Sequence, residues 1–323
     1  MKNKKKTRII VAALLLAVCA FAGYFVLAFA KEKYHFIRDH LNDISETVSK
    51  MEEDIDKIEE EVSFVSDEQF IHYDFDYSWT ENNVLVAHAM GGYEGQIYTN
   101  SLQAFEYNYD LGYRVFEVDF DLSTDYYLIC CHDEDRWREF SESGDDIEYD
   151  LEHFKSRPIC GDMSTLDGKD IIDLLIEYPD IYIITDNKYK DEYRVRMQFL
   201  QLLRYAEESG HPEVLDRVIP QIYHEKMLNY LMDLYDFKSM IYTIYKDPDW
   251  QTDTLAVFCS KTGIGFVTMW GKYATKERLD AWDKFGIMTA THTIDDREEA
   301  QGMLDLGVTM IYTNSLLPED FER

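Results

Sequence analysis

The spacing of hydrophobic positions changes along the chain, and each spacing predicts a different element. Residues 9–30 are uncharged and almost wholly apolar, and they follow a basic stretch at residues 1–8. A run of this length is about as long as a helix that spans the hydrocarbon core of a membrane. Because positive charges precede the run and acidic residues follow it, we expect a single-pass anchor with the N-terminus in the cytoplasm.

The N-terminal segment, residues 1–30, has a second interpretation. Ala28-Phe29-Ala30 resembles a signal-peptidase site, so cleavage there would release a secreted protein. We favour the uncleaved anchor because the apolar regions of signal peptides are usually shorter than this one. Both interpretations place the rest of the chain outside the cytoplasm, either at the cell membrane or secreted.

Residues 31–66 form a predicted helical stalk. Apolar side chains recur there at alternating spacings of three and four residues, which is a heptad seam, from Tyr34 to Val65. A self-associating coiled coil would make the chain a homo-oligomer, whereas a single amphipathic helix would pack on the following domain. The crowded acids between Glu52 and Glu61 repel one another and would weaken self-association.

From about Val84 the pattern changes to short β-branched runs separated by helical segments such as Leu102–Asp110 and Tyr193–Glu208. The predicted strands are Val84–His88, Val115–Asp119, Tyr127–Cys131, Ile181–Thr185, Val218–Ile222, Ser239–Ile244, Gly265–Met269, Ile287–Thr291 and Thr309–Tyr312. Alternating strands and helices predict an α/β fold, a (β/α)8 TIM barrel over residues 67–323. Nine candidates for eight places mean that one is an extra strand or a wrong assignment. The acidic stretch at about 133–168 interrupts the alternation and is interpreted as an insertion over one end of the barrel.

The net charge of the chain limits the kinds of molecule that it can bind. The formal net charge is -31. A surface this acidic repels nucleic acid, anionic lipid and long polyanions, so we expect no nucleic-acid partner.

Polar side chains that could take part in catalysis or bind a metal lie where four consecutive predicted strands end. They are His88, Glu117, Asp119, His132, Asp186 and Lys188. In a barrel of this kind the active residues lie at the C-terminal strand ends, and period two puts Glu117 and Asp119 on one face. Buried carboxylates at close range require a cation, and their hard oxygen ligands suit Mg2+ or Ca2+. Such a metal would polarise a phosphoryl oxygen, the lysine would add a fixed positive charge, and the two histidines could serve as acid and base.

The same residues carry a resemblance to a known family. The chain resembles the glycerophosphodiester phosphodiesterase family, within the phosphatidylinositol-phospholipase-C-like superfamily, at residues 86–88, 100–105, 112–119, 124–125 and 128–133, and more weakly at 183–188, 220–223, 291–295 and 311–314. It covers roughly Val84 to the C-terminus. The resemblance implies that His88 and His132 are the acid and base, that Glu117, Asp119 and Asp186 hold the metal, and that Lys188 contacts the phosphate. It also implies release of an alcohol after attack on phosphorus by water or a neighbouring hydroxyl.

Departures from the family pattern affect the substrate more than the chemistry. Ala89 replaces an arginine, Thr99 replaces a glutamate, His292 replaces a tryptophan, and Asp186 is one methylene shorter than the usual glutamate. We therefore expect an extracytoplasmic phosphodiesterase acting on a small glycerophosphodiester-like molecule, or on a phosphodiester-containing glycan or lipid headgroup. The alternatives are a catalytically altered barrel that serves as a surface binding or scaffold module, and a phospholipase that acts on intact membrane lipid.

Overall fold

The structure is a computed structural model that describes residues 70–144, 146–244 and 252–321. The predicted anchor, residues 1–30, and the predicted stalk, residues 31–66, lie outside the described residues. Within the described ranges, no helix is both long enough and apolar enough to cross a membrane.

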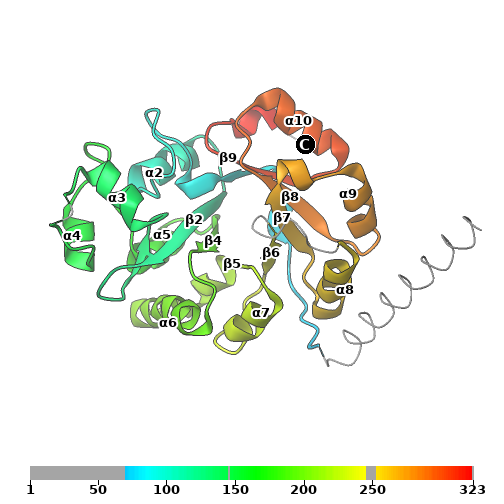
Figure 1. The fold of residues 1–323 in the computed structure, drawn as a ribbon, viewed down its shortest axis with the longest axis horizontal. Helices are drawn as coiled ribbons and strands as arrows, with labels where there is room; N and C mark the ends of the chain where they lie inside the picture. Colours follow the sequence, from blue (N-terminus) through cyan, green and yellow to red (C-terminus); the bar gives the residue numbers. More distant parts are fainter. Residues whose placement is uncertain (1–69, 145, 245–251, 322–323) are drawn as a thin grey trace, which may run out of the picture. The chain divides into compact units, whose positions relative to one another are not determined.

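Eight parallel strands close into a barrel, as the sequence predicted (Figure 1). Around the ring, each strand pairs with the next in the order β1 (Leu85–Ala87), β2 (Val115–Leu122), β4 (Tyr182–Asn187), β5 (Val218–Ile222), β6 (Ile241–Thr243), β7 (Phe266–Trp270), β8 (Met288–His292) and β9 (Met310–Thr313). The ring closes because β1 pairs with β9 on one side, Val86 opposite Tyr312, and with β2 on the other, Ala87 opposite Phe116.

Helices connect successive strands and cover the outside of the ring (Figure 1). They are α2 (Leu102–Asp110), α5 (Gly168–Glu177), α6 (Glu192–Ser209), α7 (Glu225–Met232), α8 (Thr252–Thr262), α9 (Lys276–Asp283) and α10 (Arg297–Leu306). The described residues also form short 3-10 helices: η1 (Ser78–Thr80), η2 (His88–Met90), η3 (Pro212–Arg217), η4 (Gly271–Tyr273) and η5 (Pro318–Phe321). The two helices named from the sequence are confirmed, because α2 has the predicted bounds and α6 exceeds them by one residue at each end.

Of the nine predicted strands, the third, β3 (Leu128–Cys130), is the extra one. It runs antiparallel to β2, with Phe120 opposite Cys130 and Leu122 opposite Leu128. The expectation that His132 follows one of four consecutive barrel strands was therefore wrong. β2 extends past the rim of the barrel, and β3 returns along it until the amide of Cys131 donates to the carbonyl of Asp119, 3.1 Å away. The hairpin thus brings the following residue, His132, back to the level of Asp119.

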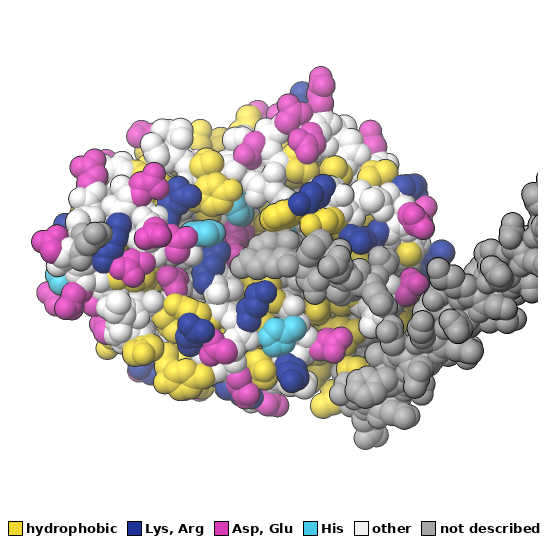
Figure 2. All heavy atoms as spheres, viewed as in Figure 1, with side chains coloured by type: hydrophobic (Ala, Val, Ile, Leu, Met, Phe, Trp, Pro, Cys, Tyr) yellow, Lys and Arg dark blue, Asp and Glu magenta, His cyan; other side chains and the backbone are white. Residues whose placement is uncertain are grey.

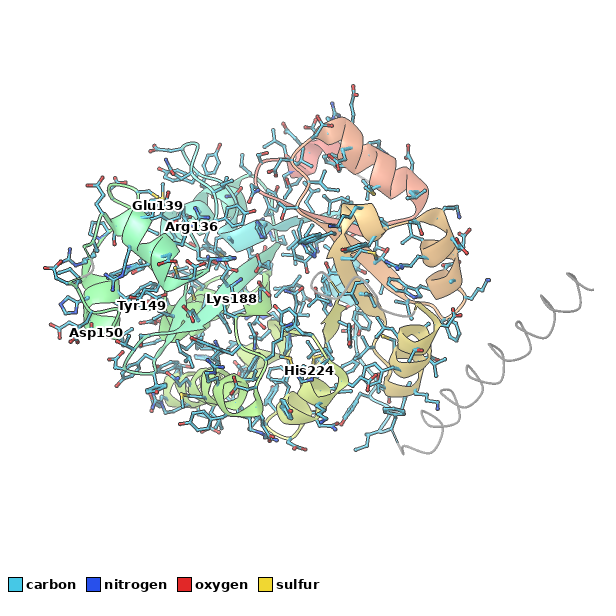
Figure 3. All side chains as sticks on the ribbon, viewed as in Figure 1. Arg136, Glu139, Tyr149, Asp150, Lys188 and His224 are labelled. Atoms are coloured by element: carbon cyan, nitrogen blue, oxygen red, sulfur yellow. The ribbon has the colours of Figure 1, made fainter. Side chains whose placement is uncertain are left out.

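Residues 133–168 form the predicted insertion at one edge of the barrel. They contain α3 (Glu134–Ser141) and α4 (Leu151–Ser156), whose N-caps are aspartates that accept bonds from backbone amides. Trp137, Tyr149 and Phe154 pack together as a small separate core beneath these helices. Tyr149, labelled in Figure 3, joins the insertion to β2, because its hydroxyl donates to Oδ2 of Asp121, 3.1 Å away. This core fixes the insertion beside the strand that carries the predicted metal ligands.

The inside of the barrel is filled by one apolar side chain from each strand. These side chains are Val86, Val115, Ile184, Ile219, Ile241, Phe266, Ala290 and Met310, and Trp79 packs against them. Because the side-chain period of a strand is two, the next inward residue of each strand lies two positions later, nearer the C-terminal rim. Those residues are His88, Glu117, Asp186, Gln221, Thr243, Thr268, His292 and Tyr312. An apolar layer therefore supports a polar layer at the end of the barrel where activity is expected.

The described chain begins with a segment that is bonded to the opposite, N-terminal side of the barrel. The amide of Tyr73 donates to the carbonyl of Thr262, 3.0 Å away, and the hydroxyl of Tyr77 donates to the carbonyl of Met240, 2.8 Å away. Gly263 lies at this contact with φ +84, and an added Cβ would overlap the carbonyl oxygen of Tyr73. Both the backbone angle and the close approach therefore require glycine at this position.

We predict that Gly263→Ala lowers the free energy of unfolding by about 2 kcal/mol or more, because alanine is strained at positive φ and would displace Tyr73. Urea unfolding followed by circular dichroism measures the change. The matched control is Gly302→Ala in α10, where an added Cβ has nothing within 4 Å. The control should be neutral or stabilising by about 0.5–1 kcal/mol, and equal stability of the two variants would contradict the prediction.

Candidate active site

A pocket of about 540 Å³ opens among the C-terminal ends of the strands. All six site residues predicted from the sequence lie in its wall. The wall consists of His88, Tyr98, Glu117, Asp119, His132, Asp186, Lys188, Gln221, Thr243, Trp270, His292, Thr293 and Tyr312. The charged members come from β1 to β4 and the segments that follow these strands, whereas β5 to β9 contribute uncharged side chains and His292.

Three carboxylates lie side by side in the charged half of the pocket. Glu117, Asp119 and Asp186 each offer an oxygen, and these oxygens lie within 4.8 Å of one another. The register explains this proximity, because Asp119 of β2 lies directly opposite Asp186 of β4. The ammonium of Lys188 contacts Asp119 and lies 2.6 Å from Oδ2 of Asp186. Figure 3 shows Lys188 beside β2 and β4.

The pKa values of Glu117, Asp119 and Lys188 show that this half of the pocket holds more negative than positive charge. Burial raises the pKa of Glu117 well above its usual range, and the negative charges of Asp119 and Asp186 raise it further. Burial alone would raise the pKa of Asp119, but Lys188, His88 and Asn100 together hold it below its usual range. The same carboxylates hold the pKa of Lys188 well above its usual range despite its burial. One lysine therefore compensates its nearest carboxylates and leaves Glu117 without a counter-charge.

The donor set fits a divalent cation. Three carboxylates against one ammonium leave a formal charge of −2, which one divalent ion neutralises. Among the described residues, Oδ1 of Asp186 is buried without a hydrogen-bond partner, and such an orphaned acceptor is what a ligand atom looks like before its ion is bound. Carboxylate oxygens are the ligands of hard cations such as Mg2+ and Ca2+. Glu117, Asp119 and Asp186 are thus the residues that could hold the metal.

Asn100 holds Asp119 in place from the loop before α2. Its Nδ2 donates to Oδ2 of Asp119, 2.8 Å away, and its Oδ1 accepts from the amide of Asp119, 3.0 Å away. The side chain is fully buried, and the backbone has φ +48, which asparagine tolerates better than most residues. Thr99, in the place of a family glutamate, is also buried and bonds to Ser101, the N-cap of α2. Asn100 therefore fixes the position of Asp119, and Thr99 bonds to the N-cap of the helix that follows Asn100.

His88 begins a tight turn after β1. Ala89 and Met90 have φ +48 and φ +70, and Gly91 has φ +85. This path aims the amide of Ala89 at Oε2 of Glu117, 2.8 Å away. Nε2 of His88 is 3.8 Å from the same oxygen, beyond hydrogen-bonding distance. At Ala89, where the family usually has arginine, the chain thus presents a buried methyl group and a backbone donor instead of a cation.

His132 enters the pocket from the end of the β2–β3 hairpin. Its Nδ1 lies 2.6 Å from Oδ2 of Asp133, and its side chain is 44% exposed. Burial would raise the pKa of Asp133, but the amide of Arg136 and the imidazole of His132 lower it. The carboxylate therefore stays ionised and stabilises a positive charge on His132.

Tyr98 lies between the two histidines. Its ring meets the ring of His88 edge to face at 4.7 Å and that of His132 at 6.4 Å, measured between centroids. The guanidinium of Arg136 is 5.7 Å from the same ring. Tyr98 thus ties the turn after β1 to the insertion helix α3, and so connects the two candidate acid–base groups.

The other half of the pocket, as far as described residues line it, carries no formal charge. Burial, with a smaller contribution from His88, lowers the pKa of His292 to about 3, so this imidazole is neutral at physiological pH. Its ring packs against Tyr312, which is itself buried. Trp270 is 40% exposed at the rim and stacks with Tyr273. His292 is therefore a neutral part of the pocket wall rather than a third acid–base group.

The sequence pattern of the Glycerophosphoryl diester phosphodiesterase family matches residues 91–317, well over half of the chain. The chain belongs to this family. Its enzyme class is accordingly that of a phosphoric diester hydrolase. A search of curated protein sequences gives no match.

Solved structures of the family share the fold. A phosphodiesterase from Oleispira antarctica, in complex with the product sn-glycerol-3-phosphate, is 15% identical and has a TM-score of 0.58, covering 73% of this chain and 94% of its own. A glycerophosphodiester phosphodiesterase from Parabacteroides distasonis is 16% identical at a TM-score of 0.56, with 74% and 94% covered. The enzyme from Thermotoga maritima is 19% identical at a TM-score of 0.54, with 72% and 95% covered. At these identities the likeness shows the barrel alone.

The six site residues of this family member could be predicted from strand ends, but their supports could not. Tyr98, Asp295 and Asn314 were not singled out, although each lies beside one of the histidines or bonds to a residue that does. A signal was present for Asn314, because it directly follows a strand of the barrel, as the other site residues do. Asp295 lies in the loop between β8 and α10 and gave no strand-end signal, although it belongs to the segment at residues 291–295 that weakly resembles the family.

We predict that Glu117→Gln raises the thermal midpoint of the metal-free protein at pH 7–8. Folding raises the pKa of Glu117, so its ionised form destabilises the fold increasingly as the pH rises above the usual range of a glutamate, and glutamine removes that cost. A shift of about 2 °C or more corresponds to 1 kcal/mol in a domain of this size. Differential scanning calorimetry of full-length protein, stripped of metal with EDTA, measures it.

Addition of Mg2+ or Ca2+ should reverse this ranking, because wild-type protein gains a bound ion and Glu117→Gln loses one of three ligands. The matched control is Glu207→Gln, an exposed acid on α6, which should behave as wild type with and without metal. A Glu117→Gln variant that is stabilised by the metal as strongly as wild type would contradict the ligand assignment.

Proposed function

We propose that this chain hydrolyses the phosphodiester bond of small glycerophosphodiester-like substrates outside the cytoplasm, with Mg2+ or Ca2+ held by Glu117, Asp119 and Asp186. The observation that carries the proposal is the arrangement of two histidines around a pocket that contains these carboxylates and Lys188. The location is supported by the charge pattern around the apolar N-terminal run.

The two histidines divide the proton transfers. One imidazole accepts the proton of the attacking water or neighbouring hydroxyl, and the other donates a proton to the oxygen of the leaving alcohol. Glu117, Asp119 and Asp186 would hold the metal, which would supply a positive charge that polarises the phosphoryl oxygens. Lys188 adds a second positive charge, which its carboxylate neighbours keep protonated and fix in position. Tyr98 lies between the two histidines and meets each ring edge to face.

A second pocket of about 630 Å³ indicates where the leaving alcohol goes. It shares His132 and Lys188 with the first pocket and is lined by the β2–β3 hairpin, the start of α3 and the start of α6. Apart from Leu122, its other lining residues all carry a polar group: Asp121, Ser123, Thr124, Tyr126, Asp133, Glu134, Tyr149, Tyr189 and Arg194, in addition to His132 and Lys188. These side chains can bond to hydroxyl or amino groups of a deacylated leaving group, whereas an acyl chain would offer them no hydrogen bonds. The pocket therefore favours a deacylated, polar leaving group over intact lipid.

The surface is consistent with a small substrate rather than a polymer. On the face in Figure 2, the described lysine and arginine side chains are scattered among acidic ones instead of gathering into one patch. Phosphate polymers are held by such patches, and the net charge of -31 repels them. A catalytically altered binding module remains the second candidate function, because Ala89 stands where the family usually has an arginine directly after the first histidine.

We predict that the metal-stripped full-length protein hydrolyses glycerophosphoethanolamine or glycerophosphoglycerol when Mg2+ or Ca2+ is added, and that phosphatidylethanolamine is not cleaved. His132→Ala should lower kcat by about 10²–10⁴-fold, the usual contribution of an acid–base group. Release of the alcohol or of glycerol phosphate, measured enzymatically or by phosphorus NMR, gives the rates.

The matched control is His211→Ala, which removes an exposed histidine that pairs with Glu213 in the turn after α6. It should keep wild-type kcat. Substrate binding without turnover in the presence of either metal would favour the binding module, and equal rates for wild type and His132→Ala would refute the catalytic assignment.

A further inference from the structure

A chain of hydrogen bonds leads away from His88 to a carboxylate outside the metal cluster. Nδ1 of His88 lies 3.0 Å from Oδ1 of Asn314, and Nδ2 of Asn314 donates to Oδ2 of Asp295, 2.8 Å away. Oδ1 of Asp295 also accepts from the amide of Asn314, 2.6 Å away, and from the hydroxyl of Thr313, 2.8 Å away. Asn314 is buried, with 4% of its surface exposed. Asp295 is therefore bound to three donors, two of which belong to one residue.

The direction of each bond in this chain is determined by chemistry. An ionised carboxylate can only accept hydrogen bonds, so the end of the Asn314 amide that faces Asp295 must be its NH2 group. The opposite end, which faces His88, is then the carbonyl oxygen, which also can only accept. Nδ1 of His88 must consequently carry a hydrogen. A neutral His88 has one hydrogen on its ring, so Nε2 keeps its lone pair.

We infer that Asp295 and Asn314 are positioning residues that hold His88 in the Nδ1–H tautomer and thereby make Nε2 the proton acceptor of the active site. The inference rests on the proposed function and deepens it. Nε2 is the ring nitrogen on the pocket side, and its nearest carboxylate oxygen, Oε2 of Glu117, is 3.8 Å away. Since that oxygen is beyond hydrogen-bonding distance and already accepts from Ala89, Nε2 is not held as a donor.

The two histidines are then not equivalent. Nδ1 of His132 lies directly on the carboxylate of Asp133, 2.6 Å away, whereas a neutral amide stands between His88 and Asp295. A carboxylate in contact stabilises an imidazolium, and an amide at the same place fixes the tautomer without adding a charge. His88 is thus the group that accepts the proton of the attacking oxygen, and His132 the group that donates a proton to the leaving alcohol.

Nitrogen NMR of the full-length chain, labelled with ¹⁵N-histidine and stripped of metal, tests the tautomer without any need for activity. The spectrum is recorded at a pH at which His88 is neutral, and its signals are assigned by difference from His88→Gln. We expect the Nδ1 signal of a protonated nitrogen and the Nε2 signal of an unprotonated one. The reverse pattern in the wild type would overturn the inference, whether or not the protein turns out to be a phosphodiesterase.

Kinetics of two variants provide the second test. Asp295→Asn keeps the shape but lets either end of the Asn314 amide face His88, and Asn314→Leu removes the amide. We expect kcat to fall by about 10-fold in the first and about 100-fold in the second, as for loss of a correctly oriented base, while KM and the metal affinity stay within about threefold. The ¹⁵N signals of His88 should shift toward a mixture of tautomers in both.

Glu298→Gln is the matched control, because it removes an exposed acid from the first turn of α10, three residues after Asp295. It should leave kcat and the tautomer unchanged. If wild type is active but Asp295→Asn retains its kcat and a single tautomer, the positioning role is refuted while the proposed function stands. If wild type hydrolyses no substrate, the proposed function fails and the NMR result alone decides the tautomer.

Discussion

The charged half of the pocket depends on one constraint: three carboxylates are buried around a single ammonium. Strand register enforces their proximity, because Asp119 and Asp186 lie opposite each other and Glu117 lies two residues before Asp119 on the same face. Lys188 binds two of them, which leaves Glu117 with a pKa raised well above its usual range. Such a cluster is costly to bury without a further cation. The neighbouring features follow from it: Asn100 fixes one acid, the amide of Ala89 fixes another, and metal binding would complete the charge balance.

The barrel could be predicted from the sequence because its two requirements are local. Each strand needs a β-branched run, and each connection needs a helical period, and both can be seen within a short window of sequence. Layering inside the barrel is equally local, since Val115 and Glu117 differ only by one period of the strand. The direction of β3 is not local. A run such as Leu128–Cys130 has the same pattern whether it lies parallel or antiparallel to its neighbour, and only its partner, β2, decides.

The supports of the site were beyond prediction for a related reason. His88 and Asn314 are 226 positions apart in sequence, and their contact exists only because the first and last strands of the barrel are neighbours. Asn100 and Tyr98 reach the site through left-handed backbone conformations, φ +48 and φ +64. Neither residue type signals such a conformation as glycine would. The candidate catalytic and metal-binding side chains could be identified at strand ends, whereas Tyr98, Asn100 and Asp295, which contact or support them, lie in loops.

The charged and the neutral side chains of the pocket wall come from different strands of the barrel. Among the described residues of its wall, every formally charged group belongs to the first part of the barrel, from β1 to the residue after β4, while β5 to β9 provide neutral groups such as Gln221, Thr243 and Tyr312. His292 conforms to this division, because burial keeps it uncharged. A tryptophan replaced by a neutral histidine therefore exchanges an apolar wall for a hydrogen-bonding one and adds no charge. Ala89 is different, since it removes a cation on the charged side, next to Glu117. Lys188 is the one fixed ammonium that the described part of the wall offers there, so a phosphate group in this pocket would rely on this lysine and on a metal held by the carboxylates.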